Sequence, residues 1–332
     1  MKILIIRFSS IGDIVLTSAV VRGVKQQVPS AELHFLTKPS FAPLLQHNPY
    51  VDKLYTLQSS LWGTAQLLRR EHYDQVVDLH CNLRSHVLRL LLCCKSTGFD
   101  KEDGARRRYV RTKLFAGTGL HVVDRYFGAV RSLQVRNDGR GLDFFMPTAA
   151  DKTALEQLLP GAPYVAIVCG AQHYTKQIPI DRLHFLCENL HLPVVLVGGK
   201  TEQELLQQED WTAQGQVFNL CGRTGLSDSA RIIGRAAVVI TPDTGMMHIA
   251  AALRRPVIAV WGCTTPQMGF APYGTEAVNL EVQALKCRPC SRFGLERCPL
   301  QHYDCMQKQD WAHIVTLCRS MYAQSVEATQ NR

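Results

Sequence analysis

Apolar and polar residues alternate along the chain in short blocks that predict strands followed by helices. In the first half, apolar or β-branched runs predict strands at residues 2–8, 32–36, 51–57 and 75–79. Apolar residues at helical spacing predict helices between them, at residues 14–24, 41–46 and 61–70. This order of elements is typical of a parallel sheet covered by helices.

The same alternation starts again in the second half of the chain. Apolar runs predict strands at residues 164–168, 193–197, 236–240 and 256–260, and another predicted strand ends at Cys221. Residues 136–163 contain Asn-Asp-Gly and several prolines, which interrupt regular structure. We therefore expect two α/β domains, residues 1–150 and 160–332. An amphipathic helix at residues 311–323 is expected to pack across their junction, with residues 325–332 frayed.

The turn Thr241-Pro242-Asp243-Thr244-Gly245 separates a predicted strand from a predicted helix. Ligands of parallel sheets bind beyond the carboxyl ends of the strands, and a helix N-terminus there favours phosphate oxygens. His248 lies one turn into the helix, on the same edge as Thr244. The alternative is that Asp243 only caps the helix and His248 is an ordinary polar residue at its rim.

A second strand-turn-helix unit opens the chain, and Asp13 lies on its glycine-containing turn. A carboxylate in this place could act in catalysis, or it could simply start the helix, where aspartate is favoured. After the predicted strand at 75–79, Arg84 and Ser85 could contact a substrate, with helix capping as the equal alternative.

The chain has 332 residues, 46% of them hydrophobic, and a formal net charge of +9. The charge favours anionic partners such as nucleotides, phosphorylated glycans, nucleic acid or an acidic membrane surface. We find no signal-peptide core and no apolar run of membrane-spanning length, so a cytoplasmic protein is expected. Most of the twelve cysteines are scattered, as is ordinary for free thiols in a reducing compartment.

Residues 101–113, with the sequence KEDGARRRYVRTK, form a strongly basic run. Such a run is usually a solvated face, but its position also suits a mobile loop that grips a phosphorylated or carboxylated acceptor. The acceptor candidates are Arg106, Arg107, Arg108 and Arg111. Tyr109 is the only aromatic residue in the run, too few for a nucleic-acid stacking platform.

Four cysteines lie close together near the end of the chain, at positions 287, 290, 298 and 305. The Cys287-x2-Cys290 spacing is one that can hold a structural zinc ion, with Cys287, Cys290, Cys298 and Cys305 as its ligands. A thiol-rich surface loop is the competing interpretation, and disulfides are disfavoured in the cytoplasm.

Together these motifs resemble the heptosyltransferase family, glycosyltransferase family nine. The resemblance rests on Ser9-Ser10-x-Gly12-Asp13, the Leu-Arg-Ser turn ending at Ser85, and Asp243-Thr244-Gly245-x-x-His248 followed by Ala-Ala-Leu. It implies the glycosyltransferase B architecture, two Rossmann-like domains facing a central cleft. The first would bind the acceptor and the second the nucleotide sugar.

The resemblance also implies the reaction and its residues. A heptose would pass from ADP-heptose to a hydroxyl of the lipopolysaccharide inner core with inversion, and Asp13 would be the general base. No cofactor or catalytic metal would be required. The implied donor-binding residues are Gly170, Thr175, Lys176, Glu202, Thr224, Asp243, Thr244, Gly245 and His248. Glu204 is an alternative to Glu202. Ser10, Gly12 and Arg84 join the arginines of the basic run as acceptor candidates.

Expected partners are therefore a nucleotide-sugar donor, an anionic glycolipid acceptor and, peripherally, the inner face of the cytoplasmic membrane, but not nucleic acid. Two alternatives stay open. The chain could be a transferase of the same family that uses another nucleotide sugar, or a non-catalytic basic protein that binds nucleotides or nucleic acid. The lack of a GxGxxG fingerprint counts against a dinucleotide-dependent oxidoreductase.

Overall fold

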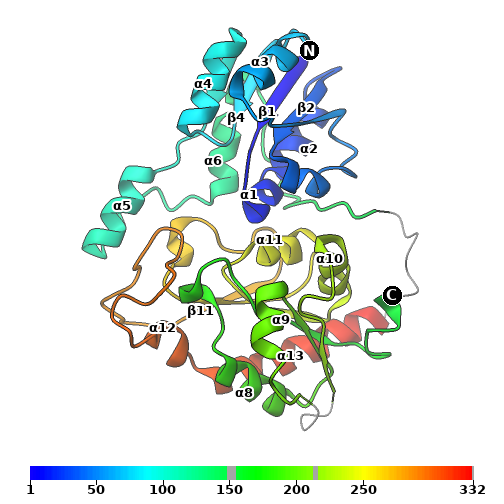
Figure 1. Cartoon of the computed structure of the whole chain (residues 1–332), viewed down its shortest axis with the longest axis vertical. Helices are drawn as coiled ribbons and strands as arrows, with labels where there is room; N and C mark the ends of the chain where they lie inside the picture. The colour runs from blue at the N-terminus through cyan, green and yellow to red at the C-terminus, as the bar shows by residue number, and fades with distance from the viewer. Residues whose placement is uncertain (148–154, 212–215, 331–332) are drawn as a thin grey trace. The chain divides into compact units, whose positions relative to one another are not determined.

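A computed structural model of the chain describes residues 1–147, 155–211 and 216–330 (Figure 1). The chain divides into two compact units. Unit 1 comprises Met1–Asp103 and Leu120–Phe145, and unit 2 comprises Gly104–Gly119 and Met146–Arg332. The expected domain limit at residue 150 lies outside the described residues.

Unit 1 is built on a parallel sheet which, in the described part of the chain, has five strands in the order β3-β2-β1-β4-β5. Its strands are β1 (Lys2–Ile6), β2 (Glu32–Thr37), β3 (Lys53–Thr56), β4 (Gln75–Asp78) and β5 (Lys95–Gly98). The central strand β1 is apolar on both faces because helices cover both.

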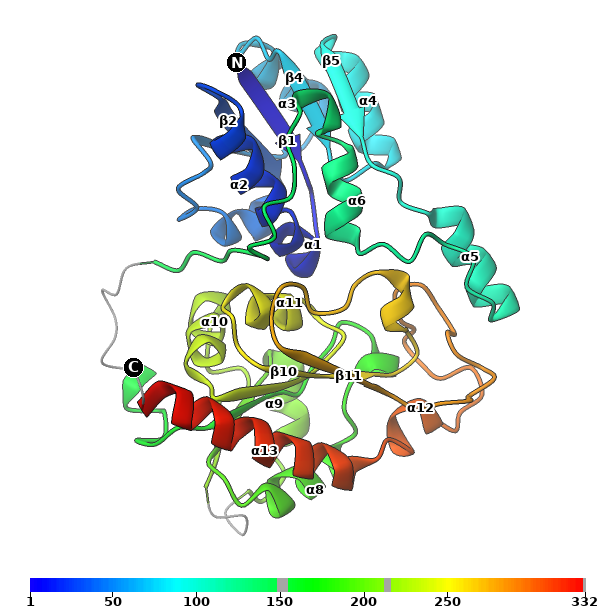
Figure 2. The same ribbon diagram turned by 180° about the vertical axis from the view of Figure 1, so that it is seen from behind.

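The helices of unit 1 lie on the two faces of this sheet (Figures 1 and 2). They are α1 (Ile11–Leu16), α2 (Ser18–Gln27), the 3-10 helix η1 (Pro39–Leu44), α3 (Leu61–Arg69), α4 (Leu83–Leu92), α6 (Val122–Gly128) and η2 (Arg131–Leu133). Helices α3 and α4 pack together and bury Leu68 and Leu88 against Leu4 and Ile6. Helices α2 and α6 pack against each other.

Unit 2 contains a second parallel sheet, in which the described residues form six strands in the order β11-β10-β9-β6-β7-β8. The strands are β6 (Val165–Val168), β7 (Val194–Val197), β8 (Val217–Asn219), β9 (Val238–Pro242), β10 (Val257–Trp261) and β11 (Ala277–Glu281). Alternate residues of each strand enter two separate cores, so Ile167 and Ile240 lie in one core and Ala166 and Val239 in the other.

Each core of unit 2 is closed by its own helices. The helical elements are η3 (Tyr174–Lys176), α8 (Ile180–Leu190), α9 (Lys200–Leu206), α10 (Leu226–Arg235), α11 (Gly245–Ala252), η5 (Pro266–Met268), α12 (Asp304–Gln307) and α13 (Trp311–Gln330). Helices α8 and α13 contact each other and bury Leu186 and Ile314 in the first core. Helices α10 and α11 cover the second core, as Figure 2 shows from behind.

The α/β class with parallel Rossmann-like sheets is confirmed. Two strands escaped the sequence analysis: β5 is half-exposed and polar, and β11 is only partly buried, so neither has a strongly apolar run. The last helix is longer than expected and continues to Gln330 instead of fraying at Ser325. Its buried residues belong to the unit 2 core.

The basic run forms a helix, α5 (Asp103–Thr112), where a mobile loop was one interpretation. Asp103 in the first turn and Arg111 in the last suit the helix dipole, and Arg106 and Tyr109 are its buried residues. Residues 104–119 belong to unit 2, although they precede the last part of unit 1 in the chain.

Candidate active site

The carboxylate of Asp243 forms a charged pair instead of capping the helix that follows it. Thr244 is the N-cap of α11, and its hydroxyl accepts a hydrogen bond from the Met246 backbone N–H at 3.2 Å. The Asp243 carboxylate accepts from Lys176 Nζ at 2.6 Å and from the Thr264 hydroxyl at 2.8 Å. The Lys176 and Asp243 side chains are 14% and 13% exposed. The interpretation of Asp243 as a simple helix cap is therefore wrong.

Lys176 is carried by the short helix η3, which follows β6. Its neighbour Thr175 is 1% exposed, and the Thr175 hydroxyl accepts from the Leu295 backbone N–H at 2.8 Å and lies 3.1 Å from Cys263 Sγ. The structure thus places Thr175 inside the fold, whereas a donor contact was expected. Its hydroxyl holds the turn that presents Lys176.

Gly170 and Glu202 meet at the carboxyl edge of the same sheet. A Cβ atom on Gly170 would lie 2.2 Å from the Glu202 carboxyl carbon, so a larger residue here would require the Glu202 side chain to move. Glu202 Oε2 accepts from the Gly199 backbone N–H at 2.7 Å at the start of α9. Glu204 is exposed on that helix, so Glu202 is the acid placed at the edge.

The remaining expected donor residues lie at helix starts in unit 2. Gly245 is the first residue of α11 and is partly exposed, whereas His248 is buried with 4% exposure. Thr224 lies just before α10 and Ser229 lies within it, and their hydroxyl groups are 2.9 Å apart. Backbone N–H groups at the start of α11 and the positive end of its dipole suit an anionic ligand.

In unit 1, Asp13 lies in the first turn of α1 and is fixed by nearby residues. One oxygen accepts from the Ser10 backbone N–H at 3.2 Å and the Ser10 hydroxyl at 2.9 Å, and the other lies 2.6 Å from an Arg7 guanidinium nitrogen. Burial disfavours the charged form, but the charge of Arg7 and the Ser10 hydrogen bonds outweigh it and lower the pKa of Asp13. The carboxylate is therefore ionised at neutral pH.

Arg7 is a site residue that the sequence analysis missed. Its side chain is 8% exposed and donates to the carbonyl oxygens of Ser9 and Leu79, which join the ends of β1 and β4. Beside it, the His80 ring packs on Phe8 at 4.7 Å. Burial and the charge of Arg7 lower the pKa of His80 to about 3, so this ring is neutral at pH 7. A cation directly after an apolar strand was the signal that could have revealed Arg7.

The Leu-Arg-Ser turn makes a helix cap. The Asn82 side chain accepts from the Ser85 backbone N–H at 2.9 Å, and the Ser85 hydroxyl accepts from the Asn82 N–H at 2.9 Å. Ser85 is fully buried, whereas Arg84 is exposed on the first turn of α4. Ser10 is exposed and Gly12 is buried within α1.

The arginines of α5 differ in their surroundings. Arg106 is 5% exposed, and its guanidinium carbon lies 5.5 Å from the centre of the Phe270 ring. It is therefore buried within unit 2 and is not placed as a free acceptor contact. Arg107, Arg108 and Arg111 are exposed. Because positions three and four apart share a helix face, these three form one cationic surface.

The four cysteines near the end of the chain do not form the expected zinc site. Among the described residues, Glu32, His34 and Glu71 are the one group of three potential ligands that lie within 4.8 Å of one another. All twelve thiols are free.

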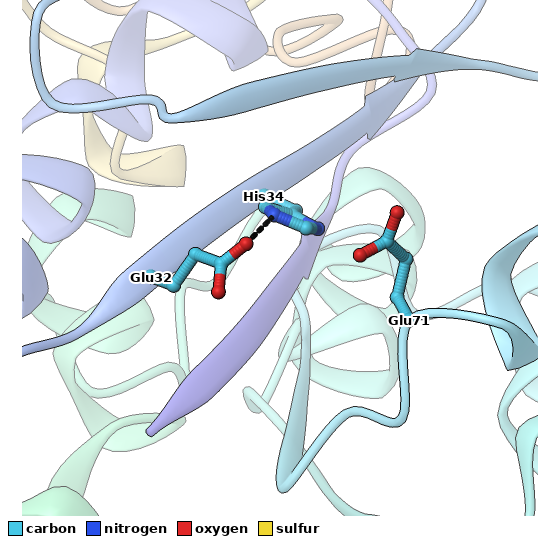
Figure 3. A group of neighbouring side chains, drawn as sticks. All are labelled: Glu32, His34 and Glu71. Carbon is cyan, nitrogen blue, oxygen red and sulfur yellow. Dashed lines mark hydrogen bonds and ion pairs between the residues drawn. The ribbon is translucent and has the colours of Figure 1, made fainter.

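Glu32, His34 and Glu71 form a salt-bridge network (Figure 3). His34 Nε2 lies 3.0 Å from Glu32 and His34 Nδ1 lies 2.9 Å from the Tyr73 hydroxyl, so both ring nitrogens are engaged. Glu71 pairs with Lys2 at 2.9 Å and also with Lys53. These lysines already neutralise the carboxylates, and Glu32 begins β2, at the sheet edge opposite to the usual ligand edge.

Each unit is a parallel α/β sheet, and unit 2 places a lysine, an aspartate and a helix N-terminus at its carboxyl edge, an arrangement typical of proteins that bind nucleotides. Residues 61–303 match the family model described as glycosyltransferase family 9 (heptosyltransferase). The chain belongs to this family and is a glycosyltransferase.

Similar proteins span nearly the whole chain. Lipopolysaccharide heptosyltransferase 1 of Pseudomonas aeruginosa is 26% identical over 322 residues, 87% of this chain and 86% of the relative. Lipooligosaccharide heptosyltransferase 2 of Haemophilus ducreyi is 27% identical over 322 residues, 85% of this chain and 89% of the relative. The solved structure of the E. coli ADP-heptose lipopolysaccharide heptosyltransferase II has a TM-score of 0.73 at 20% identity, covering 98% of this chain and 99% of that one.

Within the described residues, none of the helices combines the length and apolar character needed to cross a membrane.

Proposed function

We propose that this enzyme transfers a heptose from ADP-heptose to a hydroxyl of the lipopolysaccharide inner core, with inversion at the anomeric carbon. The observation that carries the proposal is the Asp243 carboxylate between Lys176 and Thr264, next to the N-terminus of α11. The related E. coli structure is named for ADP-heptose, and the curated relatives are named for lipopolysaccharide or lipooligosaccharide.

The donor diphosphate would bind where unit 2 offers positive charge and backbone N–H groups. Lys176 supplies the charge, and Thr244 and Gly245 open the helix whose dipole favours an anion. As the bond between sugar and diphosphate breaks, negative charge grows on the leaving oxygen. A lysine and a helix N-terminus held in place beforehand stabilise that charge without reorganisation. Glu202, Thr224 and His248 are proposed for the nucleoside and sugar.

The acceptor hydroxyl needs a base, and Asp13 in unit 1 is the candidate. Arg7 and Ser10 keep its carboxylate ionised, so it can accept a proton as the hydroxyl attacks the anomeric carbon from the face opposite the diphosphate. Inversion follows from a single displacement of this kind. Ser10, Gly12 and Arg84 are proposed to contact the acceptor.

The exposed arginines of α5 are proposed to bind the anionic groups of a glycolipid acceptor. Arg107, Arg108 and Arg111 can each form bidentate contacts with phosphate or carboxylate. This partner would place the enzyme at the inner face of the cytoplasmic membrane, as a peripheral protein.

A donor panel tests the proposal. Purified enzyme is incubated with a core acceptor and ADP-heptose, ADP-glucose, UDP-glucose or GDP-mannose, and nucleotide release and product mass are measured. ADP-heptose should be turned over at least ten times faster than the others, in line with what a specific polar contact to base or sugar contributes. Faster turnover of another donor would identify a same-family transferase with a different nucleotide sugar.

A further inference from the structure

The segment that contains Cys287 and Cys290 holds two loops of the candidate donor site together. We define residues 282–295 as the brace segment. The Leu295 backbone N–H donates to the Thr175 hydroxyl at 2.8 Å, and the Thr175 N–H donates to the Leu295 carbonyl at 3.1 Å. The Cys290 N–H donates to the Cys263 carbonyl at 3.0 Å. The brace segment therefore bonds to the turn that carries Lys176 and to the loop that follows β10.

Arg288 lies at the centre of these contacts, between Cys287 and Pro289. Its side chain is 6% exposed and donates to the carbonyl oxygens of Gly262 at 2.6 Å, Thr264 at 2.8 Å and Val282 at 3.0 Å. It also pairs with Glu281 at 2.9 Å. A planar guanidinium has enough donors for four acceptors at once, whereas a lysine ammonium has three donors on one flexible point.

The contacts of Arg288 lead directly to Asp243. Arg288 fixes the carbonyl of Thr264, and the hydroxyl of the same Thr264 donates to Asp243 at 2.8 Å. The two loops also interlock, since a Cβ atom on Gly262 would lie 2.5 Å from the Thr175 carbonyl oxygen. A shift of residues 262–264 would therefore disturb the Thr264 contact to Asp243 and press on the turn that carries Lys176.

We propose that Arg288 is a positioning residue for nucleotide binding: it holds Thr264 against Asp243 through the loop after β10. The inference rests on the proposed donor site at Asp243 and Lys176. It gives the Cys287-x2-Cys290 motif a mechanical role that needs no metal. Arg288 could otherwise only satisfy buried carbonyls, so the test must separate a role in binding from a role in stability.

The test is a double-mutant cycle on Arg288→Lys and Thr264→Val, with ADP as the titrated ligand in isothermal titration calorimetry. Each single variant should weaken ADP binding by about five- to twentyfold, the range expected for loss of one ordered polar contact. The double variant should bind no more than about twofold weaker than Thr264→Val, because both changes remove the same contact. Melting temperatures are measured in parallel, and titrations are run well below them.

Arg319→Lys is the matched control. Arg319 also donates to two backbone carbonyls of unit 2, those of Leu190 and Asn189, but it lies on α13. Its substitution should leave ADP affinity unchanged. If Arg288→Lys does not fold, Glu281→Gln replaces it in the cycle; it removes one partner of the guanidinium and should weaken ADP binding about two- to threefold.

The inference is overturned if Thr264→Val binds ADP more weakly but folded Arg288→Lys binds it as the wild type does. The same holds for Glu281→Gln where it replaces Arg288→Lys. Effects that multiply in the double variant overturn it too, because Arg288 would then act independently of Thr264. Failure of the proposed donor site is a different result: Thr264→Val and Asp243→Asn would both bind ADP as the wild type does, and the positioning role would fall with the site.

Discussion

Asp13 and Asp243 each pair with a cation beyond a strand of a parallel sheet, but the two pairs are assembled in different ways. Asp13 is held by Arg7 and Ser10, which belong to the same strand-turn-helix unit. Asp243 is held by Lys176 and Thr264, which come from the loops after two other strands. The first pair lies within one strand-turn-helix unit, although Arg7 also donates to the carbonyl of Leu79 after β4. The second pair needs three loops of the unit 2 sheet to come together.

This difference suits the two proposed roles. A base must keep its ionisation state and position through every turnover, and local hydrogen bonds fix both for Asp13. A donor site must contact a nucleotide, a diphosphate and a sugar, so it gathers residues from several loops at one sheet edge. Changes far from the site should therefore affect Asp243 more than Asp13.

The largest expected effect comes from Asp13→Asn. Loss of the proposed base should lower kcat by about 100-fold or more, while ADP affinity stays within about twofold of wild type. Turnover and ADP calorimetry on the same preparation check this. Asp181→Asn, which changes an exposed carboxylate in the first turn of α8, is the control and should retain full activity. Near-normal turnover of Asp13→Asn would remove the base assignment.

Asp243→Asn should affect ADP binding strongly, whereas Asp13→Asn affects kcat and leaves ADP binding nearly unchanged. The amide still accepts from Thr264 but leaves Lys176 without its anionic partner. ADP binding should therefore weaken by about 1–3 kcal/mol, or roughly 5- to 150-fold. Calorimetry with ADP measures the change. Asp243→Asn should also leave the acid limb of the pH–rate profile where it is in the wild type, since Asp13 is untouched. Unaltered ADP affinity would contradict the donor site.

Arg7→Gln should move the acid limb of kcat/KM to higher pH. The pKa of Asp13 is lowered because the Arg7 charge and the Ser10 hydrogen bonds outweigh burial; without the charge, burial raises it. Arg7→Lys keeps the charge and should leave the limb near its wild-type position. If the acid limb of kcat/KM stays unchanged in Arg7→Gln, that limb does not reflect the ionisation of Asp13.

The same pair predicts a pH dependence of stability. A carboxyl whose folded pKa is lowered contributes stability above its unfolded pKa, and this contribution is lost as the pH falls through the folded value. The wild type should therefore lose more unfolding free energy than Arg7→Gln on acidification below about pH 4. Urea titrations at several pH values provide the measurement.

The smallest effect is expected from the exposed face of α5. Replacing Arg107, Arg108 and Arg111 together with glutamine should raise the acceptor KM about three- to tenfold and weaken its salt dependence. The melting temperature and ADP affinity should hardly change. Arg106→Gln is the contrasting variant: it removes a buried contact with Phe270 and should lower the melting temperature. If the acceptor KM is unchanged in the triple variant, the exposed arginines of α5 only contact solvent and do not bind the acceptor.

The sequence predicted the parts of the molecule that depend on local pattern. The apolar runs of β1, β4, β6 and β9 are strands because they are buried on both faces. Asp13 and Asp243 were singled out because each follows such a run at a turn. Their roles as base and donor ligand stay predictions.

The partners of these residues could not be predicted because they depend on which loops meet in space. Nothing in the sequence around Thr264 or Arg288 indicates that one contacts Asp243 and the other holds the loop in place. Thr175 was expected at the ligand, but its hydroxyl bonds to Leu295, in a segment far along the chain. The spacing of Cys287 and Cys290 drew attention to a possible metal site, whereas Arg288 between them makes the contacts to the loop after β10.

The path of the chain through α5 has a consequence for biosynthesis. Residues 104–119 leave the ribosome before the last part of unit 1 and long before Phe270 and Pro289, which contact Arg106 and Lys113. Domains generally fold from the N-terminus during synthesis, so unit 1 can close around its sheet while this basic segment waits without its packing partners. The contact of Lys113 with Pro289 forms only when the nascent chain includes the brace segment, so premature termination before it would leave this charged helix incompletely docked.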